Sequence, residues 1–135
     1  MSNGKVKITR NGITQKHISG GSASDKEEGQ LSLDIYQNKD EIIVVAPIAG
    51  IEQKDIQISV TDEVLLIRGK RKFPLEEVLD ECFSKECFWG DFSRSIVLPE
   101  NVDTSNIDAN FHNAVLTLRI PKIEKVKTKI INIKS

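Results

Sequence analysis

The 135-residue chain fits one domain, and its 39% hydrophobic content suffices for a core, although roughly a third of the unfolded surface stays exposed in a protein of this size. With 19 basic and 20 acidic residues the formal net charge is −1, so bulk charge predicts no binding to nucleic acid or to an anionic membrane. No apolar run approaches the roughly 18 to 20 residues of a membrane span, and the opening MSNGKVKITR lacks the apolar core of a signal peptide, which together predict a cytoplasmic protein.

The first 30 residues differ in composition from the rest. Residues 1–30 contain no aromatic residue, and the stretch GGSASDKEEG is typical of a flexible linker. Within this arm, Asn11-Gly12 separates two short runs that contain aliphatic residues, the pattern of a two-residue hairpin. A lone hairpin is marginal in water, so we expect it to need a surface to lie on.

From Leu31 the pattern changes to short runs rich in β-branched residues. These runs are LSLDIY (31–36), EIIVVAP (41–47), DIQISV (55–60), VLLIRGKR (64–71), FSRSIVL (92–98), IDANF (107–111) and VLTLRIP (115–121). In the first run Leu31, Leu33 and Ile35 alternate inward, whereas the second run is apolar throughout and fits a strand covered on both faces. Seven short strands separated by Gly, Pro, Asn and Asp predict an all-β fold, an immunoglobulin-like antiparallel β-sandwich.

One stretch, FPLEEVLDECF, does not read as a strand. Pro74 suits the first turn of a helix, and Leu75, Val78 and Leu79 recur at helical spacing. The alternative is that residues 81–88 form an extended strand on a long excursion, with Gly90 as the turn back into the sheet.

Residues suited to catalysis or metal binding are sparse. The two histidines, His17 and His112, lie in no recognisable nucleophile motif. Cys82 and Cys87 lack the spacing of a zinc pair, and we interpret them as buried or interfacial small hydrophobic residues in preference to a redox switch. No glycine loop that would hold a phosphate is present. The sequence therefore predicts no enzyme, no cofactor and no metal site.

Three stretches together resemble the small heat-shock proteins, the α-crystallin domain family. They are VLLIRGKRK (64–72), FSRSIVLPENVD (92–103) and ANFHNAVLTLRIPK (109–122). The terminal Ile131-x-Ile133 resembles the docking motif of that family. This chain departs from the family pattern where Asn113 precedes Ala114 in place of the usual glycine, and its arm is shorter and poorer in aromatic residues.

The resemblance implies a flexible N-terminal arm over residues 1–30, an α-crystallin-type sandwich over 31–122 and a C-terminal extension over 123–135. It implies an ATP-independent holdase that binds partly unfolded clients, dimerises and assembles into larger oligomers. Its partners are then the chain itself and its clients. Two rivals stay open: a co-chaperone of the CS-domain type, which lacks the excursion and the Ile-x-Ile tail, and a structural coat or scaffold protein.

Two sets of site residues follow from the resemblance. The excursion, residues 72–90, is expected to reach the partner subunit as a strand, which favours the strand over the helix. The expected dimer-interface residues are Phe83, Phe88, Trp89 and Arg94. Arg94 shares a strand face with Phe92 and Ile96, where an unpaired charge is costly, so we expect it to bind a carboxylate or backbone carbonyls near the excursion.

The tail residues are expected to dock on a neighbouring subunit. In an extended tail, Ile131 and Ile133 point to the same side and can enter one groove. The resemblance places this groove along the strand at 56–60, with the strand at 107–111 as the other wall. We predict that Ile56 and Ile58 line it.

Overall fold

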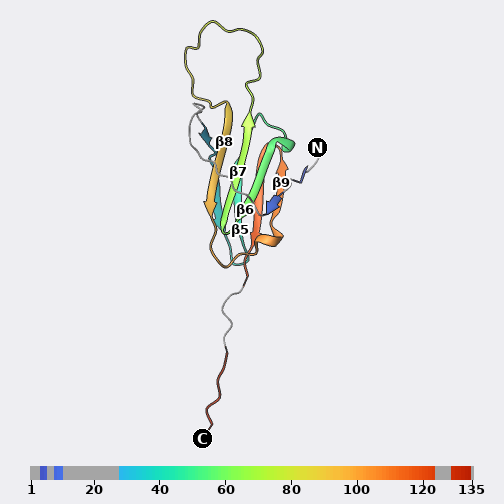
Figure 1. Ribbon diagram of the computed structural model, residues 1–135, viewed down its shortest axis with the longest axis vertical. Coiled ribbons are helices and arrows are strands. Elements are labelled where there is room, and N and C mark those ends of the chain that lie inside the picture. Colours follow the sequence, from blue (N-terminus) through green and yellow to red (C-terminus); the bar gives the residue numbers. More distant parts are fainter. Residues whose placement is uncertain (1–3, 6–7, 11–27, 124–128, 135) are drawn as a thin grey trace.

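A computed structural model describes residues 4–5, 8–10, 28–123 and 129–134 of the chain. Its strands stack in two sheets, a long loop projects from one end of the sandwich, and the C-terminal residues lead away from the opposite end (Figure 1). The hairpin expected around Asn11-Gly12 lies outside the described residues, as does most of the linker expected over residues 20–29.

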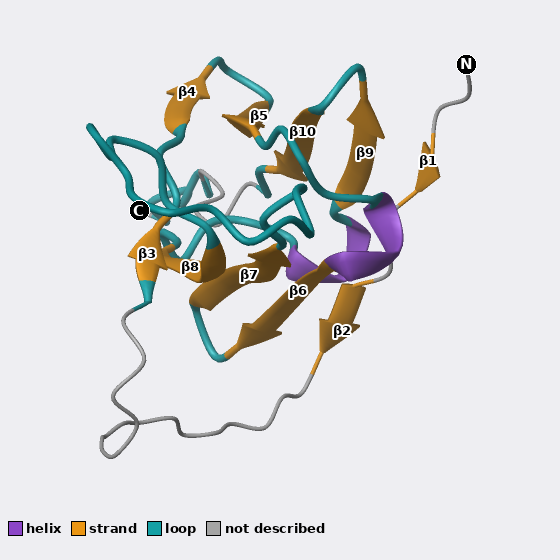
Figure 2. Cartoon of the chain, turned by 90° about the horizontal axis from the view of Figure 1, so that it is seen from above, coloured by secondary structure: helices purple, strands orange, loops and turns teal. Residues whose placement is uncertain are grey.

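The described part of the chain contains ten strands. They are β1 (Gly4–Lys5), β2 (Ile8–Arg10), β3 (Gly29–Gln30), β4 (Asp34–Gln37), β5 (Glu41–Pro47), β6 (Ile56–Thr61), β7 (Val64–Arg71), β8 (Gly90–Val97), β9 (Asp108–His112) and β10 (Val115–Pro121). Short 3₁₀ turns at Gln53–Asp55 and Thr104–Asn106 precede β6 and β9. The strands are hydrogen-bonded in the order β1-β9-β10-β5-β4 in one sheet and β2-β6-β7-β8-β3 in the other, and Figure 2 shows the two sheets facing each other.

The predicted immunoglobulin-like β-sandwich is confirmed, and each of the seven predicted runs overlaps a strand. The bounds of β5, β7 and β10 coincide with those read from the sequence. Along β6, Ile56, Ile58 and Val60 are buried while the residues between them are not, because successive side chains of a strand point to opposite faces.

The core lies between the two sheets. Its largest fully buried side chains are Val44, Ile48, Ile58, Leu65, Ile67, Leu116, Leu118 and Ile120. Among residues 28–123 and 129–134, no polar or charged residue is buried. Because full burial of one such aliphatic side chain contributes about 1.5–3 kcal/mol, this apolar layer is the main source of stability.

The strand predicted over residues 31–36 starts later than the sequence predicts. β4 begins at Asp34, and Ile35 is 47% exposed instead of facing inward. The reason is that residues 29–37 cross between the sheets: β3 pairs with β8, the amide of Leu31 donates to the carbonyl oxygen of Ser93 (3.0 Å), and β4 then pairs with β5. Leu31 is therefore buried between the sheets, whereas Ile35 lies on an edge strand.

The expectation that β5 is covered on both faces is wrong for the single chain. Ile42, Val44 and Ala46 are buried, but Ile43 and Val45 on the opposite face are only half-buried. The sandwich has two layers, so one face of each sheet points outward. The outward side chains of β5 are still half-buried because β5 lies between β10 and β4 within its sheet.

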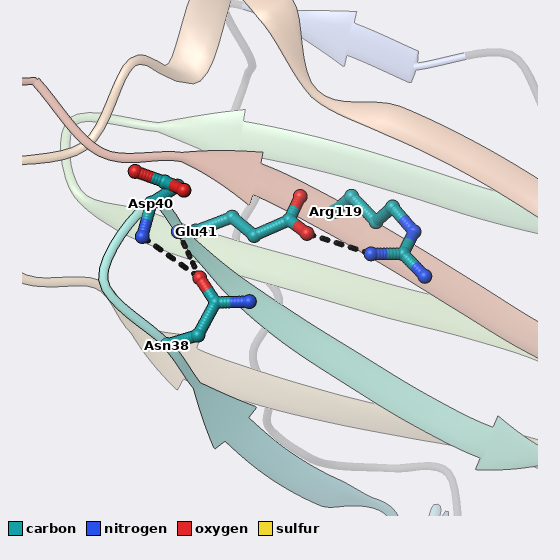
Figure 3. A network of polar contacts seen from close by, with 4 residues as sticks. All are labelled: Asn38, Asp40, Glu41 and Arg119. Carbon is teal, nitrogen blue, oxygen red and sulfur yellow. Dashed lines mark hydrogen bonds and ion pairs between the residues drawn. The ribbon is translucent and has the colours of Figure 1, made fainter.

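A small polar network fixes the turn into β5 (Figure 3). The Asn38 Oδ1 accepts hydrogen bonds from the backbone amides of Asp40 (2.8 Å) and Glu41 (2.9 Å), which is the local bonding expected of asparagine in a turn. The Glu41 carboxylate in turn pairs with Arg119 Nη1 of β10 at 2.6 Å. The turn and the two central strands are thereby linked.

The hairpin between β9 and β10 keeps its turn without the usual glycine. His112 pairs with Val115, so the loop has two residues, Asn113 (φ 53°) and Ala114 (φ 63°). Two positive φ angles are characteristic of a type I′ turn. Asparagine tolerates this conformation, but alanine carries a steric cost there of about 1–2 kcal/mol.

Between β7 and β8 lies the excursion, whose residues 72–89 form neither a helix nor a strand and whose last residue, Gly90, begins β8. The helical reading of Pro74 to Cys82 is wrong, and the strand over residues 81–88 is not formed in the single chain. A strand requires a neighbouring edge for its backbone groups, and the excursion projects beyond the sheets (Figure 1). Gly90, at its return, has φ 126°, a conformation that favours glycine.

Candidate functional site: assembly surfaces

The sandwich carries no cluster suited to catalysis in its described part. His112 is exposed at the end of β9, and His17 lies outside the described residues. No group of three or more His, Cys, Asp or Glu side chains in residues 28–123 and 129–134 is arranged to hold a metal ion. The described ranges also contain no helix long and apolar enough to cross a membrane. The surfaces that stand out are the apolar ones.

The excursion exposes a set of large apolar side chains. Val78 is 94% exposed and Phe83 is 95% exposed, and Phe73, Leu75 and Leu79 are each about half exposed. Apolar side chains gathered on one projecting loop indicate an interaction surface, because a soluble monomer rarely leaves such a patch in water.

Two of the expected interface residues, Phe88 and Trp89, pack at the base of the excursion, where it leaves the sandwich. The rings of Trp89 and Phe73 meet edge to face, with centroids 5.5 Å apart and an interplanar angle of 84°. Phe88 packs over Gly29 of β3 so closely that a Cβ on this glycine would lie 2.5 Å from the Phe88 ring. Phe88 and Trp89 are half-buried, so only part of each is available to a partner.

Arg71, at the end of β7, also holds this base and was not predicted as a site residue. Its Nε donates to the carbonyl oxygen of Ala49 (2.7 Å), and its Nη1 donates to that of Phe88 (3.3 Å). The guanidinium also lies 5.1 Å from the centroid of the Phe92 ring, within the range of a cation–π contact. In the sequence Arg71 belongs to the basic run GKRK, and nothing distinguishes it there from its neighbours.

Arg94 of β8 is half-buried, and its hydrogen bond goes to the backbone. Its Nη1 donates to the carbonyl oxygen of Leu31 at 2.8 Å. The acceptor is thus a backbone carbonyl, but it belongs to the crossing segment after β3 and not to the excursion.

Both cysteines are exposed free thiols in the excursion, so they are not buried in the single chain, and their placement at an interface stays a prediction. The Sγ of Cys82 lies 3.4 Å from the carbonyl oxygen of Ser84. The cysteines do not lie on a strand because the excursion forms none.

The predicted groove residues, Ile56 and Ile58, are buried and contribute to the core. They lie on β6, and Ala109 and half-buried Phe111 lie on β9 of the other sheet. Beyond these two strands the structure places the N-terminal strands: β2 pairs in parallel with β6, and β1 pairs antiparallel with β9. Sequence reasoning missed both pairings, because strands of two and three residues carry no readable periodicity.

The tail is extended and free of its own domain over residues 129–134. Ile131 is 79% exposed and Ile133 is 93% exposed, and these residues lead away from the sandwich (Figure 1). All side chains of residues 129–134 are exposed, and docking of the tail on a neighbouring subunit stays a prediction.

The chain is a two-sheet β-sandwich domain with an exposed apolar loop at one end and an exposed, isoleucine-containing tail at the other. The chain belongs to the Hsp20/alpha crystallin family, whose sequence profile matches residues 34–134. This finding confirms the resemblance read from the sequence.

Individual relatives agree with the family assignment. The chain is 37% identical over 100 residues to "Small heat shock protein C4" of Rickettsia felis, covering 74% of this chain and 61% of that protein. It is 35% identical over 102 residues to "Heat shock protein 16" of Schizosaccharomyces pombe, covering 73% and 70%. The matched region thus spans only 61% of the length of the Rickettsia felis protein, and it spans 62% of the length of another relative, "Spore protein SP21" of Stigmatella aurantiaca.

Solved structures share the fold. Heat shock protein 16.0 from Schizosaccharomyces pombe superposes with a TM-score of 0.64 at 34% identity, covering 79% of this chain and all of the other. A small heat-shock protein from Xylella fastidiosa, described as having a distinct high order structure, gives a TM-score of 0.65 at 26% identity, covering 78% and 96%.

Proposed function

We propose that this protein is an ATP-independent holdase chaperone of the cytoplasm, which binds partly unfolded proteins and prevents their aggregation. The observation that carries the proposal is the exposed apolar surface of the excursion and tail on a member of the Hsp20/alpha crystallin family. The described residues offer no cluster for chemistry, and holding a client requires none. Its partners are further copies of itself and its clients, and it uses no cofactor and no metal.

The excursion builds the dimer in this proposal. Val78 and Phe83 project into solvent in the single chain, and a partner subunit would bury them. The partner offers sheet edges with which the excursion can pair as a strand. Phe88 and Trp89 act from the base, where they set the direction in which the excursion leaves the sandwich. Arg94 contributes to the dimer interface through the crossing segment after β3, to which it is hydrogen-bonded.

The tail links dimers into oligomers. Ile131 and Ile133 dock beside β6 and β9 of a neighbouring subunit, at the groove proposed to be lined by Ile56 and Ile58. Burying two isoleucines contributes about 3–6 kcal/mol before the cost of ordering the tail, so each contact is weak and exchangeable. Repetition in every subunit supplies the avidity of the assembly.

The test of holdase activity is the light scattering of a heat-denatured client enzyme, measured without ATP at increasing ratios of protein to client. Suppression of scattering at near-equimolar ratio, unchanged by added ATP, supports the proposal. Scattering equal to that with an inert protein of the same mass, while this chain stays folded, would contradict it.

The scaffold alternative has one observation in its favour: residues 1–30 contain no aromatic residue with which to capture clients. A scaffold would assemble to the same mass but leave client scattering unchanged. The CS-domain alternative predicts a monomer, so a dimer or larger species in solution excludes it.

A further inference from the structure

The strands β1 and β2, here called the N-terminal clasp, join the two sheets at one flank of the sandwich. Gly4 and Lys5 pair with Phe111 and Asn110 of β9 in one sheet. Ile8, Thr9 and Arg10 pair in parallel with Ile58, Ser59 and Val60 of β6 in the other. Figure 2 shows β1 beside β9 and β2 beside β6 on the same side of the molecule.

Chain length requires these two pairings to be neighbours in space. Lys5 and Ile8 are three residues apart, which an extended chain covers in at most about 11 Å. Facing sheets are packed about 10 Å apart, which is close to this limit, so β1 and β2 must pair with their sheets on the same flank of the sandwich. The flank at which β6 and β9 end their sheets is therefore the one that the clasp closes.

Without the clasp, β6 and β9 would be edge strands with unpaired backbone groups. An edge can pair with one further strand at a time. The clasp therefore uses the same two strands that form the walls of the proposed tail groove. The sequences also match in kind, since KVKIT in the arm and INIK in the tail each place two β-branched residues two positions apart beside lysine.

We infer that the N-terminal clasp and the tail of a neighbouring subunit compete for the flank formed by β6 and β9, so that tail docking requires release of the clasp. This inference rests on the proposed docking of the tail. The clasp belongs to the same chain as its binding surface and is present at high effective concentration, but it pairs through only five residues. Such a short ladder opens readily, and the competition can adjust oligomer size without any covalent change.

The experiment measures binding of a fluorescent peptide, residues 127–135, to full-length chains that carry Ile131→Ala and Ile133→Ala, so that their own tails do not compete. One variant adds Ile8→Pro with Thr9→Pro, which removes the backbone donor facing β6 whichever of the two residues supplies it. The matched control adds Ile8→Val with Thr9→Val, which keeps both donors and the β-branched side chains. A peptide with alanine in place of both isoleucines reports nonspecific binding.

We expect the proline variant to bind the peptide about tenfold more tightly than the valine control if the clasp is released about a tenth of the time in the control. Hydrogen exchange of residues 58–60 should also be faster in the proline variant without peptide and should slow when peptide is added. Equal affinities and equal exchange in the two variants would overturn the clasp and leave tail docking intact. Absence of peptide binding in both would overturn tail docking and the competition with it.

Discussion

Arg94 of β8 and Leu31 are joined by a 2.8 Å hydrogen bond from Nη1 to the backbone carbonyl oxygen, which links the segment crossing between the sheets to the second sheet. A hydrogen bond from a charged donor contributes about 1.5–3 kcal/mol, so Arg94→Ala should lower the free energy of unfolding by about that amount. Urea denaturation at fixed protein concentration measures it. Arg68→Ala is the control: the exposed Arg68 lies 3.5 Å from Gln57, and its loss should cost less than about 0.5 kcal/mol.

If Arg94 acts on assembly through the crossing segment, Arg94→Ala should also weaken the dimer. Sedimentation over a range of concentrations would detect this. An unchanged melting curve together with an unchanged dimer mass would mean that Arg94 merely reaches solvent.

Ala114 offers a gain in stability. Because its φ of 63° is costly for alanine, Ala114→Gly should stabilise the folded chain by about 1 kcal/mol. Asn113→Gly, at φ 53°, should give a smaller gain because asparagine already tolerates this conformation. Chemical denaturation of both variants measures the two changes in the free energy of unfolding. A larger gain at Asn113 would contradict the larger steric cost assigned to Ala114.

Phe88 and Gly29 are expected to be coupled. A methyl group at Gly29 would meet the Phe88 ring, so Gly29→Ala should destabilise the chain by about 1–3 kcal/mol. In a Phe88→Ala background the same change should cost little. A double-mutant cycle measures the coupling, and purely additive effects would mean that the two residues are not in contact.

Loss of the exposed apolar side chains of the excursion should weaken the dimer. Val78→Ser with Phe83→Ser removes side chains that are 94% and 95% exposed in the single chain, so the fold should be unaffected. Each side chain buried by a partner contributes about 1.5–3 kcal/mol, so loss of both side chains should weaken the dimer at least about a hundredfold. Glu77→Gln with Glu81→Gln is the control in the same loop, with unchanged dimer affinity expected.

The sandwich was readable from the sequence because its seven main strands alternate or are continuously apolar, as VLLIRGKR over 64–71 illustrates. The conformation of the excursion could not be predicted from the sequence. Leu75, Val78 and Leu79 have helical spacing, but they are exposed and do not belong to the core of this chain. The clasp could not be predicted either, since pairing of Ile8 with Ile58 is long-range and carries no local signal.

Sequence patterns also do not tell whether an apolar side chain is buried within its own chain or by a partner subunit. The sequence located Phe83 and Ile133 as candidate assembly residues, and both are exposed in the single chain. Arg71 was missed because its three contacts come from Ala49, Phe88 and Phe92, which only the folded chain brings together.

Assembly through the tail is tested most directly by light scattering, which measures the mass in solution of the full-length chain with Ile131→Ala and Ile133→Ala. The matched control is Ile130→Ala, because Ile130 is an adjacent isoleucine, 83% exposed, that points to the other side of an extended tail. We predict that the double variant collapses to dimers while the control keeps the oligomer of the unmodified chain. An oligomer mass unaltered by loss of both Ile131 and Ile133 would contradict assembly through the tail.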